Sequence, residues 1–172
     1  MKVFRYGLAM VLTAALASPA LARRFDVCIN PATDVVPDDV GAPGFPTAGD
    51  GFVAVGIIVP GGTIPDDGVG VASCSSIASK RIGTFFARGR IVAGLPNAAP
   101  NDLAYVDWQF RIGGEGAIDT SGPVKTTPTY PQTIVGATGG LGPAKGKALV
   151  EVLGGGGFQF RLIVPRRRGQ EE

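Results

Sequence analysis

The side chains able to move protons in this sequence are carboxylates, tyrosines, lysines and arginines, because the chain contains no histidine. This absence excludes Ser-His-Asp and Cys-His nucleophiles, an imidazole proton shuttle near neutral pH, and zinc sites built on imidazole. Among the remaining groups, Asp107, Arg88 and Tyr105 are candidate catalytic residues, with Glu151 as a fourth. The alternative for each is a solvated side chain or one paired with a neighbouring strand.

Two acidic pairs could offer oxygen ligands to Ca²⁺: "VPDDVG" at 36–41 and "IPDDGVG" at 64–70. They lack the alternating ligand spacing of a calcium loop, and Pro-Asp-Asp before Gly or Val is typical of tight turns. We therefore expect turns at both places, and neither a metal site nor a cofactor.

The two cysteines, Cys28 and Cys74, raise a choice between a disulfide and a reactive thiol. A catalytic thiol would need an activating base, and the chain has no histidine to supply one. We expect the two residues to form one intrachain disulfide, as is common in exported proteins.

The stretch "TIVGATGGLGPAKGKALVEV" at 133–152 contains glycines like those of a loop that binds a dinucleotide's pyrophosphate. That fingerprint requires a strand before the glycines and a helix after them. Here Pro143 and Gly146 follow, and then a run of alternating and β-branched residues. The context excludes a nucleotide site at this stretch.

The candidate residues lie on or beside short apolar runs of sequence. The chain contains 27 glycines and 14 prolines, many of which separate these runs. Nothing is typical of a long amphipathic helix. About eight antiparallel strands at this spacing predict a barrel or a sandwich, and a closed eight-stranded barrel can hold one small ligand. The expected strands are 25–29, 52–59, 81–92, 104–112, 117–120, 132–135, 148–153 and 158–164.

Alternation is clearest in "AYVDWQFRI" at 104–112, where Trp108 and Phe110 share one face and Asp107 lies on the other. In "GTFFARGRIV", Phe85 and Arg88 divide in the same way. We favour the apolar face as the interior, which makes Trp108, Phe110 and Phe85 candidate ligand-binding residues as well as core. The alternative places the polar row inside, with the outer wall covered by neighbouring subunits.

Residues 1–22 have the pattern of a secretory signal peptide: a short basic region, an apolar run too short to span a bilayer, and a small-residue cleavage site at Ala20-Leu21-Ala22. We expect a secreted or periplasmic protein without a membrane anchor after cleavage. The expected organisation is a single barrel domain at 23–165, which includes an extended Pro-rich surface segment at 30–49, and a charged disordered tail at 166–172.

Removal of the signal peptide changes the charge balance. Lys2 and Arg5 account for two of the 16 basic residues, which leaves 14 basic against 14 acidic side chains. A balanced chain gives no reason to expect a nucleic acid or an anionic membrane as partner.

The segment "IVGATGGLGPAKGKA" at 134–148 resembles the signature of dirigent proteins and the related allene oxide cyclase barrels, approximately hVGGTGxFxxARGxA. Ala137 stands where the signature has glycine, Lys145 where it has arginine, and Gly142 where dirigent proteins commonly have arginine. Weaker pieces agree in order, so that the resemblance covers roughly 48–164. They are "GDGFVAVGIIVPGGTI", "IGTFFARGRIV" and "DWQFRIGGEGAIDTSG".

The resemblance implies an eight-stranded antiparallel barrel of calycin type, a homotrimer as its assembly, and a hydrophobic cavity open at one end. It also implies an exported protein that binds a small lipophilic or phenolic intermediate and directs its cyclisation or coupling, as an isomerase or cyclase. The Asp-plus-Arg cavity chemistry of plant members does not map onto this sequence residue by residue. Two alternatives remain: a non-catalytic carrier of a lipophilic ligand, and a structural or stress-related secreted barrel filled by its own side chains.

Overall fold

The computed structural model describes residues 22–37, 48–96, 98–142 and 144–165. Nearly all of the expected signal peptide, part of the Pro-rich segment and the expected charged tail therefore lie outside the described residues. In the described part, no helix is both long and apolar enough to cross a membrane.

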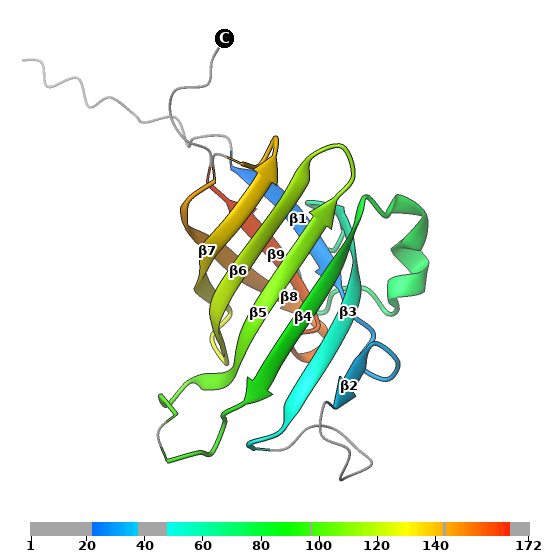
Figure 1. The fold of residues 1–172 in the computed structure, drawn as a ribbon. Coiled ribbons are helices and arrows are strands. Elements are labelled where there is room, and N and C mark those ends of the chain that lie inside the picture. Colours follow the sequence, from blue (N-terminus) through cyan, green and yellow to red (C-terminus); the bar gives the residue numbers. More distant parts are fainter. Residues whose placement is uncertain (1–21, 38–47, 97, 143, 166–172) are drawn as a thin grey trace, which may run out of the picture.

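The described chain is built almost entirely of antiparallel strands, joined by turns and two short 3₁₀ helices (Figure 1). Eight of the strands form a closed barrel, which confirms the predicted fold class. The elements are β1 (Arg23–Cys28), β2 (Val35–Pro37), β3 (Gly51–Pro60), η1 (Cys74–Lys80), β4 (Gly83–Ile91), β5 (Asp102–Ile112), β6 (Gly116–Lys125), β7 (Thr129–Gly139), β8 (Gly146–Gly154), η2 (Gly155–Gly157) and β9 (Gln159–Val164).

The barrel closes through its first strand. Strands β3 to β9 form a meander in which each strand pairs with the next, and β1 pairs with both β9 and β3. The short β2 pairs with the beginning of β3, whereas β1 pairs with its end. Within the described part of the expected surface segment at 30–49, the chain thus extends the sheet by β2.

Alternating burial along the strands shows which face is the interior. In β5 every second residue is buried, including Trp108 and Phe110, and the residues between them are exposed. The apolar face therefore lines the inside of the barrel, as favoured from the sequence. The polar row faces outward.

Two strands are longer than the sequence pattern indicated. The expected strands at 117–120 and 132–135 extend to β6 and β7, of ten and eleven residues. Their inward positions include Thr120 and Gln132, which are polar and buried, and Pro123 and Pro131 interrupt the apolar alternation. Proline and inward polar groups are the features that hide a strand from a pattern of alternating hydrophobicity.

The glycine-rich stretch after β7 closes one end of the barrel. Gly139 and Gly146 flank the turn with φ of 61° and 91°, which only glycine adopts without strain. Between them Leu141 and Ala144 are buried and join the main core. Figure 1 shows this turn at the end opposite the β4–β5 connection, so the stretch acts as a plug and not as a phosphate loop.

A second, smaller core lies outside the barrel wall, under the segment 61–80. It contains Val59, Ile64, Ile77 and Leu153. Cys28 of β1 and Cys74 of η1 form the expected disulfide beside it. The segment is thereby attached covalently to the strand that closes the barrel.

Candidate functional site

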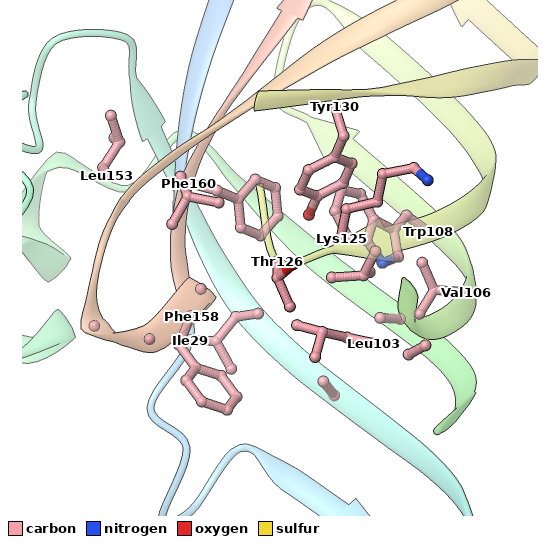
Figure 2. A pocket seen from close by; sticks show the side chains of 18 of the residues that line it. Ile29, Leu103, Val106, Trp108, Lys125, Thr126, Tyr130, Leu153, Phe158 and Phe160 are labelled. Carbon is pink, nitrogen blue, oxygen red and sulfur yellow. The ribbon is translucent and has the colours of Figure 1, made fainter. Parts of the chain in front are cut away.

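A cavity of about 690 Å³ opens at the end of the barrel opposite the plug. Every strand except β1 gives residues to its wall, and Ile29, directly after β1, also lines it. Figure 2 shows part of this wall from close by. A volume of this size is typical of a site for a small organic ligand. The cavity excludes, for this chain, the alternative of a barrel filled by its own side chains.

The space results from the sizes of the inward side chains. Ala54 and Ala87 face each other across β3 and β4, and Ala104 on β5 is inward on the next strand. Towards the plug, larger residues such as Phe110 and Ile118 fill the interior completely. The barrel therefore has a packed half and a hollow half.

Aromatic rings form the inner part of the cavity wall. Trp108 and Phe160 are stacked, with ring centroids 4.8 Å apart and an interplanar angle of 26°. Phe85 meets both rings edge-on, at 5.6 Å from Trp108 and 5.5 Å from Phe160. Offset-stacked and edge-to-face arrangements of this kind are favourable and rigid. The inner part of the wall is therefore apolar and closely packed.

The Tyr130 hydroxyl is a polar group within this aromatic wall. Tyr130 is only 3% exposed, and its ring lies 6.5 Å from that of Trp108. Figure 2 shows the hydroxyl directed into the space near Phe160 and Thr126. Burial raises the pKa of Tyr130, so the phenol stays protonated through the neutral and moderately alkaline range.

The other titratable group that lines the cavity is Lys125, at the rim. Its Nζ lies 2.7 Å from Oδ1 of Asp102, whose side chain is almost completely buried. The positive charge of Lys125 is therefore compensated by this carboxylate. The ion pair is neutral as a whole, so neither residue offers an uncompensated charge to a ligand.

Glycines 154–157 form the rim between β8 and β9. Gly155, Gly156 and Gly157 all have positive φ, so the turn fits only glycine without strain. The Gln159 amide holds the neighbouring segment in place: it donates to the carbonyl of Val71 and accepts from its N–H, both at 2.7 Å. The backbone of these glycines thus forms one part of the rim, and the Lys125 side chain forms another.

The structure separates the residues singled out from the sequence. Trp108 and Phe85 line the cavity, whereas Phe110 is buried on the plug side. Asp107, Arg88 and Tyr105 are exposed on the outer wall, where Arg88 pairs in register with Asp107. They alternate with the inward residues of the same strands, so the arrangement that puts Trp108 inside puts them outside.

Glu151 also lies away from the cavity, 3.6 Å from Arg161 on the outer wall. Tyr130 and Phe160 are among the cavity residues that sequence reasoning did not select. Among the described residues, no cluster of three or more His, Cys, Asp or Glu side chains could hold a metal ion.

Comparison with known proteins supports the fold. No family model matches the chain, and no curated protein matches it. A solved structure of pyocyanin demethylase is similar with a TM-score of 0.54 and 18% identity, covering 84% of this chain and 99% of that chain. The Diels Alderase AbmU from Streptomyces koyangensis is similar with a TM-score of 0.50 and 18% identity, covering 84% of this chain and 66% of that chain.

At this identity the likeness concerns the fold alone. It supports a barrel of this type and does not assign the chain to the dirigent or allene oxide cyclase families.

Proposed function

We propose that this chain is an exported barrel protein that binds a small lipophilic or aromatic molecule in its cavity and directs its cyclisation or coupling. The observation that carries the proposal is the hollow half of the barrel, lined by Trp108, Phe160, Phe85 and Tyr130. The two similar structures are named for a demethylase of pyocyanin and for a Diels Alderase, and both names describe chemistry on small organic molecules. The dirigent-like signature at 134–148 agrees with the same class of activity.

The mechanism that suits this cavity is conformational control. A ring closure or a coupling reorganises bonds within an already reactive molecule, so the protein needs to supply orientation and exclusion of water. The stacked rings of Trp108 and Phe160 would hold the substrate against one wall. The neutral Tyr130 hydroxyl is placed to stabilise negative charge that develops on the substrate.

A non-catalytic carrier is the second candidate, and one observation favours it. Among the described residues that line the cavity, the titratable groups are Tyr130 and Lys125, and Lys125 is paired with Asp102. An apolar cavity with a single neutral donor would also suit a protein that only binds and transports its ligand.

Ligand binding can be tested with the intrinsic fluorescence of Trp108, because it is the only tryptophan in the chain. We expect N-phenyl-1-naphthylamine, an uncharged aromatic probe, to quench Trp108 emission in a saturable manner. The variant Ala87→Leu narrows the cavity beside Trp108 and should weaken binding by about tenfold. Ala78→Leu adds the same atoms at an exposed site on η1 and should leave the affinity unchanged.

Absence of saturable quenching, or equal effects of the two variants, would contradict binding in the cavity. Native mass spectrometry of protein purified after export provides an independent test, since a co-purified lipophilic mass should disappear in Ala87→Leu. The same spectrum reports whether the chain begins at Arg23 and whether it forms the proposed homotrimer.

A coupling assay distinguishes the two candidate functions. A small phenol is treated with a one-electron oxidant, with and without the protein, and the enantiomeric excess of the coupled product is measured. A directing protein produces an excess that Ala87→Leu reduces, whereas a carrier leaves the product racemic although it binds the phenol.

A further inference from the structure

Two hydrogen-bond donors in the cavity have no partner in the part of the chain that the structure describes. Neither the Oη of Tyr130 nor the Nε1 of Trp108 makes a hydrogen bond within the described residues. The side-chain oxygens of Thr120 and Gln132 are completely buried and have no partner within the described residues. The Oη of Tyr130 and the Nε1 of Trp108 differ from them, because neither atom is completely buried. Both residues line the cavity and are at most 5% exposed. A molecule that hydrogen-bonds to these donors therefore reaches them from the cavity.

The surroundings of the two donors are apolar. Phe85 and Phe160 pack against Trp108, and Ala87 lies opposite it across β4 and β5. A donor that is buried in such surroundings without an acceptor is unfavourable, and a ligand that supplies the acceptor recovers that cost. An indole N–H can only donate, so the complementary group on the ligand is an acceptor.

The charges around the cavity indicate which kind of acceptor group the ligand carries. Lys125 is the cationic residue that lines the cavity, and its charge is compensated by Asp102. A carboxylate or phosphate buried beside Tyr130 would therefore lack a counter-ion, which is costly in an apolar site. An uncharged carbonyl oxygen needs only donors.

We propose that the cavity recognises an uncharged, planar aromatic ketone or quinone, whose carbonyl oxygen accepts a hydrogen bond from Tyr130 Oη, with Trp108 Nε1 as the second donor of the same wall. This inference rests on the proposed function, since it names the class of molecule that the cavity binds. Burial keeps the phenol of Tyr130 protonated and thus able to donate. Donation to the carbonyl withdraws electron density from the ring system, which is the polarisation that a ring closure or coupling next to a carbonyl requires.

The test compares two ligands of nearly equal shape, fluorenone and fluorene, in which a carbonyl replaces a methylene group. Affinities are measured by isothermal titration calorimetry for the unmodified protein, for Tyr130→Phe, and for the matched control Tyr105→Phe. Tyr105 is exposed on the outer wall, so its variant removes the same hydroxyl far from the cavity. We expect the unmodified protein to bind fluorenone about fivefold to tenfold more tightly than fluorene.

In Tyr130→Phe, the affinity for fluorenone should fall about fivefold while that for fluorene changes less than twofold, and Tyr105→Phe should change neither. Infrared spectroscopy adds a readout that a purely structural role of Tyr130 would not move. The carbonyl stretching band of bound fluorenone should lie at lower frequency in the unmodified protein than in Tyr130→Phe.

Two other results would overturn the proposal. Equal affinities for the two ligands with no shift of the carbonyl band would show that the hydroxyl does not recognise a carbonyl, and binding in the cavity would still stand. Binding of neither ligand, together with a failure of the Trp108 quenching test, would overturn the proposed function itself.

Discussion

At the scale of single residues, the barrel interior contains polar groups whose burial destabilises the folded state. Thr120 is 1% exposed, and its hydroxyl has no hydrogen-bond partner within the described part of the chain. It lies opposite Trp108 on β5 and opposite Ile134 on β7. Burial of an unpartnered hydroxyl is destabilising.

Thr120→Val removes this hydroxyl and keeps the shape of the side chain. We expect the free energy of unfolding to stay equal or to rise by up to about 1 kcal/mol, measured by chemical denaturation. Thr133→Val makes the same change at an exposed position of β7 and serves as the control. A loss of more than about 1 kcal/mol for Thr120→Val would mean that a buried water bonds the hydroxyl in solution.

The raised pKa of Tyr130 leads to a prediction for alkaline stability. Because burial favours the neutral phenol, the folded state keeps its proton at pH values where the unfolded chain, with a tyrosine pKa of 10.0, loses it. The unfolded state then binds fewer protons than the folded state, so the free energy of unfolding decreases as the pH rises above 10. The loss should approach about 1.4 kcal/mol per pH unit.

Denaturation curves between pH 9 and pH 11.5 measure this effect. Tyr130→Phe has no proton to lose and should show a flatter decline than the unmodified protein, whereas Tyr105→Phe should decline as the unmodified protein does. Parallel curves for all three proteins would contradict the burial of Tyr130 as the cause.

The role of Tyr130 could not be predicted from the sequence for a physical reason. Tyr130, Gln132 and Ile134 alternate inward on β7, but Pro131 interrupts the run and one of the three side chains is an amide. The sequence pattern therefore indicates a strand only at 132–135, and Tyr130 lies before it. Trp108 and Phe85, on strands with clean alternation, were assigned to the interior correctly from the pattern alone.

At the scale of elements, the segment 61–80 depends on a buried ion pair of the outer wall. Asp26 on β1 is fully buried; its carboxylate accepts from Arg161 Nε at 2.7 Å and from the N–H groups of Gly62 and Ile64 at 2.9 Å. The hydrogen bond that Arg161 donates to Asp26 is the main cause of the raised pKa of Arg161. The pair thus fastens the segment to two neighbouring strands.

Asp26→Ala should lower the free energy of unfolding by about 3–5 kcal/mol, because it leaves a buried guanidinium without its principal partner. Asp67→Ala is the control within the same segment. Asp67 is exposed and accepts from the nearby N–H groups of Val69 and Gly70, so its loss should cost below about 1 kcal/mol. Equal and small effects in denaturant titrations would show that the pair does not hold the segment.

The strands themselves were largely predictable, and their register was not. Each of the eight expected strands corresponds to a strand of the barrel, because apolar runs between glycine and proline turns are a direct signal. The hollow half depends on small residues meeting across strands, as Ala54 does with Ala87. Which residues meet depends on the register of the strands, and turns and bulges set that register, as the bulge between Asp119 and Thr120 does for β6 and β7.

At the scale of the whole molecule, the barrel combines a rigid closure with an open cavity. The plug around Leu141 and the packed half fix one end, and the outer segment 61–80 reinforces the wall at β1 and β3. Turn residues, including glycines 154–157, and side chains such as Phe158 line the cavity near its mouth. The packed half and the wall therefore stabilise the barrel, and the cavity stays open. The open space in the hollow half lowers the stability, because fewer side chains pack there.

The disulfide belongs to the wall, and this placement can be tested. Cys28 is on the strand that closes the barrel, and its bond to Cys74 closes a loop with a sequence separation of 46 residues. Replacing both cysteines by alanine should lower the free energy of unfolding by about 4 kcal/mol, the loop-closure entropy that the unfolded chain regains. Because the bond lies outside the barrel, the affinity for the naphthylamine probe should change less than twofold under conditions where the variant is folded. Denaturant titration combined with Trp108 quenching measures both quantities. A variant that unfolds normally but loses the probe would show that the disulfide shapes the cavity and does not merely brace its wall.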